Sequence, residues 1–251
     1  MAIAIAIPRQ VDIFDDLNFH VPGARQLGGA VEITEIIFPN AGQLRSRRVV
    51  TRSRARGTGK YPSWKMGRML QWESRNELNA FRLLDCCPTV TQFMEQPCQI
   101  CYNQGGQSKS HYPDILVEIS GRKELWEVKP EGKAQQPEVA GRTALLTQAL
   151  PTWGYEYRLA IDRDLAKQPR LRNAQILLRF GRHEISGYEY ESVRLIHKRQ
   201  GVLVWSEACN GAYGAKGREI LCNLTLRGIL TVDINAPWSD NTKFFATKGC
   251  M

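Results

Sequence analysis

Apolar and polar residues alternate over several short stretches in the first two thirds of the chain, and this period of two indicates β-strands. The clearest stretches are 115–119 and 124–129, which are separated by Ser120-Gly121-Arg122. This arrangement predicts two antiparallel strands joined by a tight turn. Further short strands are expected over 89–94, 98–102 and 155–161.

Helical spacing of apolar residues appears between these strands. We expect one helix from near Leu70 to just before Pro88, with Ala80, Phe81 and Leu84 facing inward. A second helix is expected to start at Pro137, because proline suits the first turn of a helix, and to end near Leu150. A strand, a crossover helix and another strand are typical of a mixed α/β sheet.

The pattern changes in the last third of the chain. A helix over 171–180 is followed by expected helices over 187–199, 201–209 and 215–227, and then by two short strands, 229–234 and 243–246. Helices followed by a terminal hairpin favour a winged-helix module. We therefore predict a restriction-endonuclease-like α/β domain over 60–168, a smaller winged-helix-like domain over 169–251 and an N-terminal segment over 1–59.

Charge is distributed unevenly along the chain. The 251 residues include 34 Lys and Arg against 25 Asp and Glu, which gives a net charge of +9, and 43% are apolar, as in a globular protein. Nine cations and no acid lie between Gly42 and Arg68, so that the remaining 25 cations equal the acids in number. The cations of this basic segment are Arg45, Arg47, Arg48, Arg52, Arg54, Arg56, Lys60, Lys65 and Arg68.

Such a basic segment is typical of an arm that binds nucleic-acid phosphates, and Tyr61 and Trp64 are available to stack beside it. The alternative is a solvated linker whose charges only maintain solubility. No apolar run approaches the roughly 18–20 residues that span a bilayer, so we expect a cytoplasmic protein without a membrane partner.

Candidate catalytic chemistry is concentrated around the two clearest strands. Asp114 follows Pro113 directly before the first strand, and Glu127 and Lys129 lie on the second. Residues two apart share one face of a strand, and the turn brings the start of one strand beside the end of the other. We therefore expect two carboxylates and an ammonium group to converge.

The expected helix contributes further acids. Glu77 shares a helical stripe with Ala80, Phe81 and Leu84, and a buried acid on such a stripe needs a metal, a cation or a hydrogen-bond donor. Glu73 lies one turn earlier and is the other candidate. Each of these residues also has an ordinary interpretation, as an exposed strand pair, a turn aspartate or a helix acid paired with an arginine.

Carboxylate oxygens suit a hard divalent cation. Mg²⁺, or Mn²⁺ as its substitute, bound by Glu77, Asp114 and Glu127 would activate water against a phosphodiester. Lys129 would orient that water or offset charge on the transition state. These residues predict a metal-dependent nuclease.

The motifs resemble those of a known family. Pro113-Asp114 and Glu127-Val128-Lys129 resemble the signature of the PD-(D/E)XK nuclease superfamily. Together with the stretch from Lys65 to Ser74, Glu77, Gln96-Pro97 and Pro130, they resemble the TnsA endonuclease subunit of heteromeric transposases over about residues 45–165. The resemblance implies that Glu77, Asp114 and Glu127 bind metal, that Lys129 completes the site, and that Glu73 matches a recurrent acid.

The resemblance also implies a biological role. It implies cleavage at the 5′ ends of a mobile DNA element, while a partner recombinase processes the 3′ ends and an ATP-dependent regulator contacts the complex. Two alternatives stay open. One is a restriction- or repair-type nuclease that acts alone, and the other is a catalytically silent module that only docks on DNA or protein.

Overall fold

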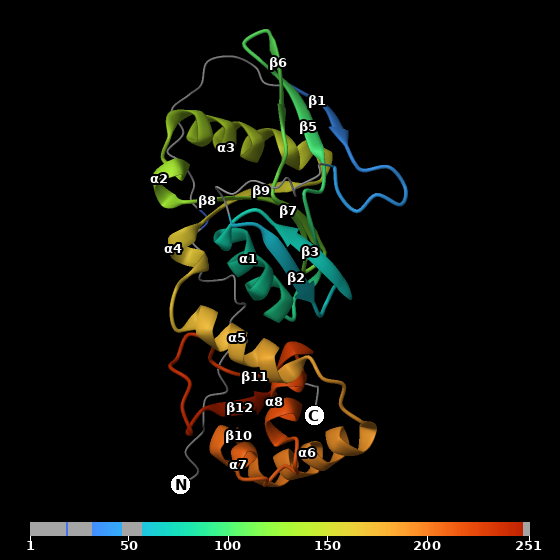
Figure 1. Cartoon of the computed structure of the whole chain (residues 1–251), viewed down its shortest axis with the longest axis vertical. Coiled ribbons are helices and arrows are strands. Elements are labelled where there is room, and N and C mark those ends of the chain that lie inside the picture. Colours follow the sequence, from blue (N-terminus) through green and yellow to red (C-terminus); the bar gives the residue numbers. More distant parts are fainter. Residues whose placement is uncertain (1–18, 20–31, 47–56, 248–251) are drawn as a thin grey trace. The chain divides into compact units, whose positions relative to one another are not determined.

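The chain folds into two compact units. The computed structural model describes Phe19 and residues 32–46 and 57–247 (Figure 1). Of these, Phe19 and residues 32–46, 57–84 and 90–166 form an N-terminal unit, and residues 85–89 and 167–247 form a C-terminal unit. The C-terminal unit thus begins two residues before the predicted boundary and includes the short segment 85–89.

A four-stranded mixed sheet forms the centre of the N-terminal unit. Its strand order is β4 (Val90–Glu95), β7 (Ile115–Ile119), β8 (Arg122–Lys129) and β9 (Glu156–Ile161). The first three strands are antiparallel neighbours, whereas β8 and β9 are parallel. The crossover between the parallel strands contains α2 (Glu131–Ala134), α3 (Pro137–Ala149) and a 3₁₀ turn, η1 (Leu150–Trp153). The predicted mixed α/β architecture is therefore confirmed.

The turn between β7 and β8 sets the register of the sheet. It contains two residues, Ser120 and Gly121, with φ of 49° and 78°, a left-handed pair that matches the twist of a hairpin. Strand β8 therefore begins at Arg122 and not, as predicted, at Glu124. Ile115 lies opposite Trp126, and the next position outward places Asp114 beside Glu127.

The remaining elements of this unit surround the sheet. A three-stranded antiparallel sheet contains β1 (Glu32–Ile37), β5 (Gln99–Gln104) and β6 (Gln107–His111), and a hairpin contains β2 (Gly59–Ser63) and β3 (Arg68–Trp72). Helices α1 (Arg75–Cys86) and α4 (Asp162–Leu165) complete the set. Because β1 pairs with β5, residues 32–37 belong to this unit, unlike the separate segment 1–59 that the sequence predicted.

The expected helix start near Leu70 was wrong. Leu70 lies in β3, where it is fully buried opposite Tyr61, and the helix begins at Arg75. The sequence offers a physical reason, because Ser74 can cap the helix and the residues before it alternate like a strand. The predicted inward positions Ala80, Phe81 and Leu84 are all fully buried.

Apolar side chains hold α3 and α1 to the sheets. Leu145 and Leu146 of α3 belong to one buried cluster with Leu125 of β8 and Tyr157 of β9. Phe81 of α1 packs against Phe93 of β4, with ring centroids 6.0 Å apart. Truncating a buried leucine in such a cluster typically costs about 2–5 kcal/mol. Helix α3 thus packs on β8, the strand that carries Glu127 and Lys129, and α1 packs on β4.

The C-terminal unit contains α5 (Arg170–Gly181), α6 (Gly187–Gln200), β10 (Leu203–Val204), α7 (Trp205–Cys209), α8 (Gly217–Leu226), β11 (Leu230–Thr231) and β12 (Lys243–Ala246). The predicted helix over 201–209 was partly wrong, because residues 203–204 form a strand, and the strand predicted over 229–234 covers only 230–231. The strands form a small antiparallel sheet in the order β10, β12, β11. Glycine is required at position 181, because a Cβ atom there would lie 2.7 Å from the backbone carbon of Cys222 in α8.

The order of helices and hairpin is the one on which the winged-helix prediction rests, and that assignment stays a prediction. Helix α8 is buried along residues 221–226, and its exposed side chain is Arg218. It therefore offers little surface to a DNA groove. Within the described ranges, no helix is both long and apolar enough to cross a membrane.

Candidate active site

A cavity of about 690 Å³ opens in the N-terminal unit. Its walls come from the start of α1, the ends of β6 and β8, the residues before β7, and the helices α2 and α3. All four residues predicted to be catalytic line it, namely Glu77, Asp114, Glu127 and Lys129, and so does Glu73. The cavity thus gathers side chains that are more than fifty positions apart in the sequence.

The backbone around Asp114 is fixed on both sides. Its N–H donates to the carbonyl of Trp126 at 2.9 Å, and its carbonyl accepts from the N–H of Gln96, also at 2.9 Å. Gln96 has a φ of 47°, a left-handed conformation that costs a non-glycine residue about 1 kcal/mol or more. One side-chain oxygen of Asp114, Oδ2, accepts from the N–H of Val128 at 2.8 Å. The carboxylate is therefore held beside the end of β8.

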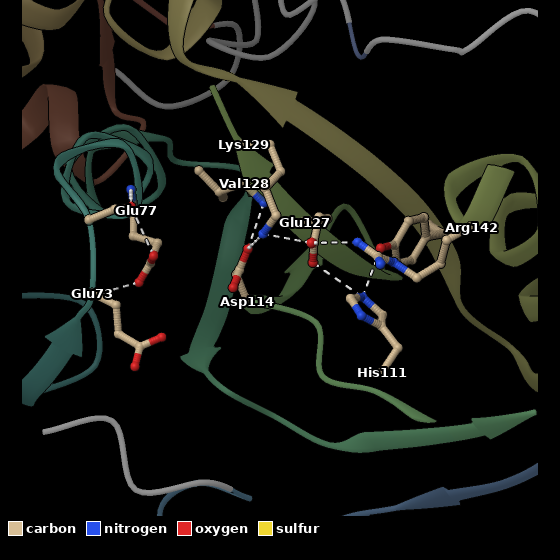
Figure 2. Close-up of polar contacts among 10 residues, drawn as sticks. Glu73, Glu77, His111, Asp114, Glu127, Val128, Lys129 and Arg142 are labelled. Carbon is tan, nitrogen blue, oxygen red and sulfur yellow. Dashed lines mark hydrogen bonds and ion pairs between the residues drawn. The ribbon is translucent and has the colours of Figure 1, made fainter. Parts of the chain in front are cut away.

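Lys129 connects the two central acids. Its Nζ lies 2.6 Å from Glu127 Oε1 and 3.5 Å from Asp114 Oδ2 (Figure 2). The strand places Glu127 and Lys129 on the same face, and the hairpin register places Asp114 beside Glu127. The structure therefore brings these three groups together as the sequence pattern predicted.

Burial and neighbouring charges shift the pKa values of Asp114, Glu127 and Lys129. Burial alone would raise the pKa of Glu127, but contact with His111 and the charge of Lys129 outweigh it and lower this pKa to about 2. Burial and the neighbouring Glu127 raise the pKa of Asp114 well above its ordinary value. Burial opposes the charge of Lys129, yet the two carboxylates raise its pKa overall. Glu127 is thus a stable anion, and Lys129 a stable cation.

Glu77 occupies a different position from the other two acids. It is the third residue of α1, and its carboxylate accepts hydrogen bonds from the N–H of Glu73 and from Ser74 Oγ, both at 2.8 Å. The Glu77 N–H donates back to Ser74 Oγ at 3.2 Å, which completes a capping arrangement at the helix start. Burial raises the pKa of Glu77 despite these hydrogen bonds. Both oxygens of Glu77 are therefore already engaged.

The sequence analysis did not identify three further residues near Glu127. Two of them contact Glu127 directly, and the third contacts one of these two. Arg142 of α3 donates to Glu127 Oε1 at 3.2 Å, and His111 at the end of β6 places Nε2 3.2 Å from Glu127 Oε2. The buried Tyr157 hydroxyl lies 2.9 Å from the same His111 nitrogen. The only sequence signal for any of them is the position of His111 three residues before Asp114.

Two cations on the cavity walls were also missed. Arg75 begins α1 and Lys133 lies in α2, and both side chains are exposed. No ion pair of either is found among the described residues. They are well placed to meet an anion that approaches the carboxylates.

Three of the predicted DNA-binding cations are among the described residues. Arg47, Arg48, Arg52, Arg54 and Arg56 fall outside the described residues. Arg45 lies 3.9 Å from Glu95, and Lys65 donates to the carbonyl of Val90 at 2.6 Å. Lys60 is exposed on β2. None of these three described cations lines the cavity.

The acids suit a hard divalent cation. Glu127 Oε2 is buried without a well-aligned hydrogen bond in the described part of the chain, and the contacts of Asp114 there use Oδ2, which leaves Oδ1. Each central carboxylate thus has an oxygen to offer, and carboxylate oxygens are what Mg²⁺ and Mn²⁺ prefer. Among the described residues, no three His, Cys, Asp or Glu side chains are already gathered around a common point that could hold a metal ion.

Comparison with known families gives one match. Residues 87–168, about a third of the chain, match the family described as TnsA-like endonuclease N terminal. This part of the chain is therefore similar to a TnsA-type endonuclease. The matched range contains Asp114, Glu127 and Lys129, whereas Glu77 precedes it. No curated protein sequence matches the chain significantly.

The architecture of the N-terminal unit agrees with this match. Its mixed α/β architecture fits a restriction-endonuclease-like fold and is consistent with the PD-(D/E)XK superfamily.

Proposed function

We propose that this protein is a Mg²⁺-dependent DNA endonuclease subunit that cuts the 5′ ends of a mobile element. The observation that supports this most strongly is the arrangement of Asp114 and Glu127 around the ammonium group of Lys129 in one cavity. The match of the surrounding residues to TnsA-like endonucleases adds to it.

Asp114 and Glu127 are the residues that would hold the cation, with Glu77 as a third ligand. When bound, a divalent cation supplies positive charge to the phosphate and makes water easier to deprotonate. Glu127 is ionised at neutral pH because its pKa is low, and a bound cation would favour the ionised form of Asp114 against the burial that raises its pKa. Each oxygen of Glu77 accepts one hydrogen bond, so Glu77 would contribute a remaining lone pair.

Lys129 acts as a charged donor in this proposal. Its pKa is raised, so the ammonium group keeps its proton and is not the base that accepts one from water. A fixed ammonium group beside the phosphate stabilises the negative charge that develops in the transition state. Arg75 and Lys133, which both line the cavity, are placed to hold neighbouring phosphates of the DNA.

The wider assignment follows from the family resemblance. We propose that a recombinase subunit processes the 3′ ends, that an ATP-dependent regulator contacts the complex, and that the basic segment and a winged-helix-like C-terminal unit contact DNA.

A cleavage assay tests the proposal. Purified protein is incubated with end-labelled DNA and Mn²⁺, with and without a candidate recombinase, and the cut strand is mapped. Asp114→Ala and Glu127→Ala should abolish nicking and leave DNA binding nearly intact, because the carboxylates serve the metal. Unchanged nicking in either variant would refute the assignment. Efficient cleavage without any partner would favour a nuclease that acts alone.

A further inference from the structure

Four side chains from four elements form a closed ring of contacts on one side of the cavity. Glu127 comes from β8, Arg142 from α3, Tyr157 from β9 and His111 from β6. Figure 2 shows Arg142 and His111 approaching the Glu127 carboxylate from the side opposite Asp114. Arg142 also donates a hydrogen bond to the Tyr157 hydroxyl, which in turn contacts His111.

The ring links Tyr157 to the Glu127 carboxylate by two routes. Because an arginine can only donate, the Tyr157 oxygen accepts from Arg142, which also donates to Glu127 Oε1. The same hydroxyl lies 2.9 Å from His111 Nε2, and this nitrogen lies 3.2 Å from Glu127 Oε2.

The two oxygens of Glu127 therefore have different surroundings. Oε1 is held by two cations, Lys129 at 2.6 Å and Arg142 at 3.2 Å. Oε2 is buried and faces one ring nitrogen, His111 Nε2, at 3.2 Å. A glutamate has three rotatable bonds, so that an orientation of this kind persists only when its neighbours are themselves fixed.

We propose that Arg142 and Tyr157 are positioning residues, which hold Glu127 through one oxygen and through His111 so that its carboxylate is oriented for a divalent cation. This inference rests on the proposed function, because it concerns the same site. Arg142 is mostly buried and Tyr157 almost wholly so. Tyr157 lies outside the lining of the cavity, so its effect must pass through Glu127 and His111.

Metal affinity provides the test. Partners that orient a metal ligand typically change metal affinity or activity by about 10–100-fold when they are mutated. We expect Tyr157→Phe and Arg142→Gln to weaken Mn²⁺ binding by a factor in this range, measured as free Mn²⁺ by electron paramagnetic resonance. Arg142→Lys should recover part of the loss, since it restores a cation but not the second donor.

Matched controls separate positioning from a general loss of structure. Tyr155→Phe removes a hydroxyl from a half-buried tyrosine outside the ring, and Arg122→Gln removes an ion-paired arginine at the far turn of the same strand. Both should bind Mn²⁺ like the wild type. Circular dichroism of the metal-free variants should match the wild type, and excess Mn²⁺ should restore most of the cleavage by Tyr157→Phe.

A double-mutant cycle completes the test. Because both residues act through Glu127, the double variant should lose less affinity than the two single losses combined. Wild-type Mn²⁺ affinity in both single variants would overturn the inference, and so would full additivity in the double variant. If the wild type neither binds Mn²⁺ nor cleaves DNA, the proposed function itself fails. If the wild type does both and the variants bind Mn²⁺ equally well, only the positioning role fails.

Discussion

Glu77 offers a direct test of how burial and hydrogen bonding balance in the metal-free protein. Its carboxylate accepts two hydrogen bonds at 2.8 Å and lies at the positive end of α1. Hydrogen bonds to a charged group contribute about 1.5–3 kcal/mol each, and charge at a helix start adds about 0.3–1 kcal/mol. Burial offsets much of this, because it raises the pKa of Glu77 overall.

The sign of that shift determines the expected result. A raised pKa in the folded state means that folding favours the protonated form, so the stability from this group is full below its unfolded pKa and is lost as pH rises through the folded pKa. Glutamine resembles the protonated form and keeps an acceptor oxygen. We therefore expect Glu77→Gln to stay within about 0.5 kcal/mol of the wild type at pH 8, and Glu77→Ala to lose about 1–2 kcal/mol, as for other helix caps.

Urea denaturation followed by tryptophan fluorescence, in the presence of a chelator, measures both values. Glu189 provides a comparison, because it also accepts from a serine hydroxyl and a backbone N–H, both of Ser186, at the start of α6, but there the hydrogen bonds lower its pKa. Equal losses of unfolding free energy in Glu77→Gln and Glu77→Ala would refute the reasoning. The ionised carboxylate would then contribute stability that burial does not cancel. Cleavage by the stable Glu77→Gln variant shows separately whether Glu77 is also a metal ligand.

Three other outcomes are expected. Asp114 has a raised pKa, so the metal-free wild type should lose stability relative to Asp114→Asn as pH rises from 5 to 8 in urea titrations, whereas a constant difference would contradict the shift. Replacing Arg45, Arg47 and Arg48 by Ala should flatten the salt dependence of DNA binding by about 0.9 per lost phosphate contact, and an unaltered slope in fluorescence anisotropy would show that these residues contact no phosphate. Gly181→Ala should destabilise the C-terminal unit by about 1–3 kcal/mol in thermal unfolding, because its Cβ would meet the backbone of α8, and an unchanged melting temperature would show that the helices separate easily.

The hairpin that carries the site could be predicted because its determinants are local. Alternation, a Ser-Gly turn and a fixed period of two were enough to place Asp114 beside Glu127. The expected helix start was wrong because the pattern around Leu70 has apolar residues that suit either a strand or a helix. Pairing with Tyr61 of the preceding strand decided between them, and that contact is not visible in a short window of sequence.

The supporting residues of the site could not be predicted for a related reason. Arg142, His111 and Tyr157 reach Glu127 or each other from three separate elements, and their approach depends on how α3 and β6 pack. The role of Ser74 in a capping box was readable from its spacing to Glu77, but the burial that changes the pKa of Glu77 was not. The basic segment could be recognised as charged, yet the use of Lys65 in an internal hydrogen bond depended on the fold.

The central claim is that Asp114 and Glu127 together hold a divalent cation beside Lys129. Anomalous X-ray scattering from a crystal grown with Mn²⁺ tests it most directly. The account predicts an anomalous peak within bonding distance of one oxygen from each carboxylate, in the cavity between α1 and β8. A peak at another site, or none at a Mn²⁺ concentration that supports cleavage, would contradict it.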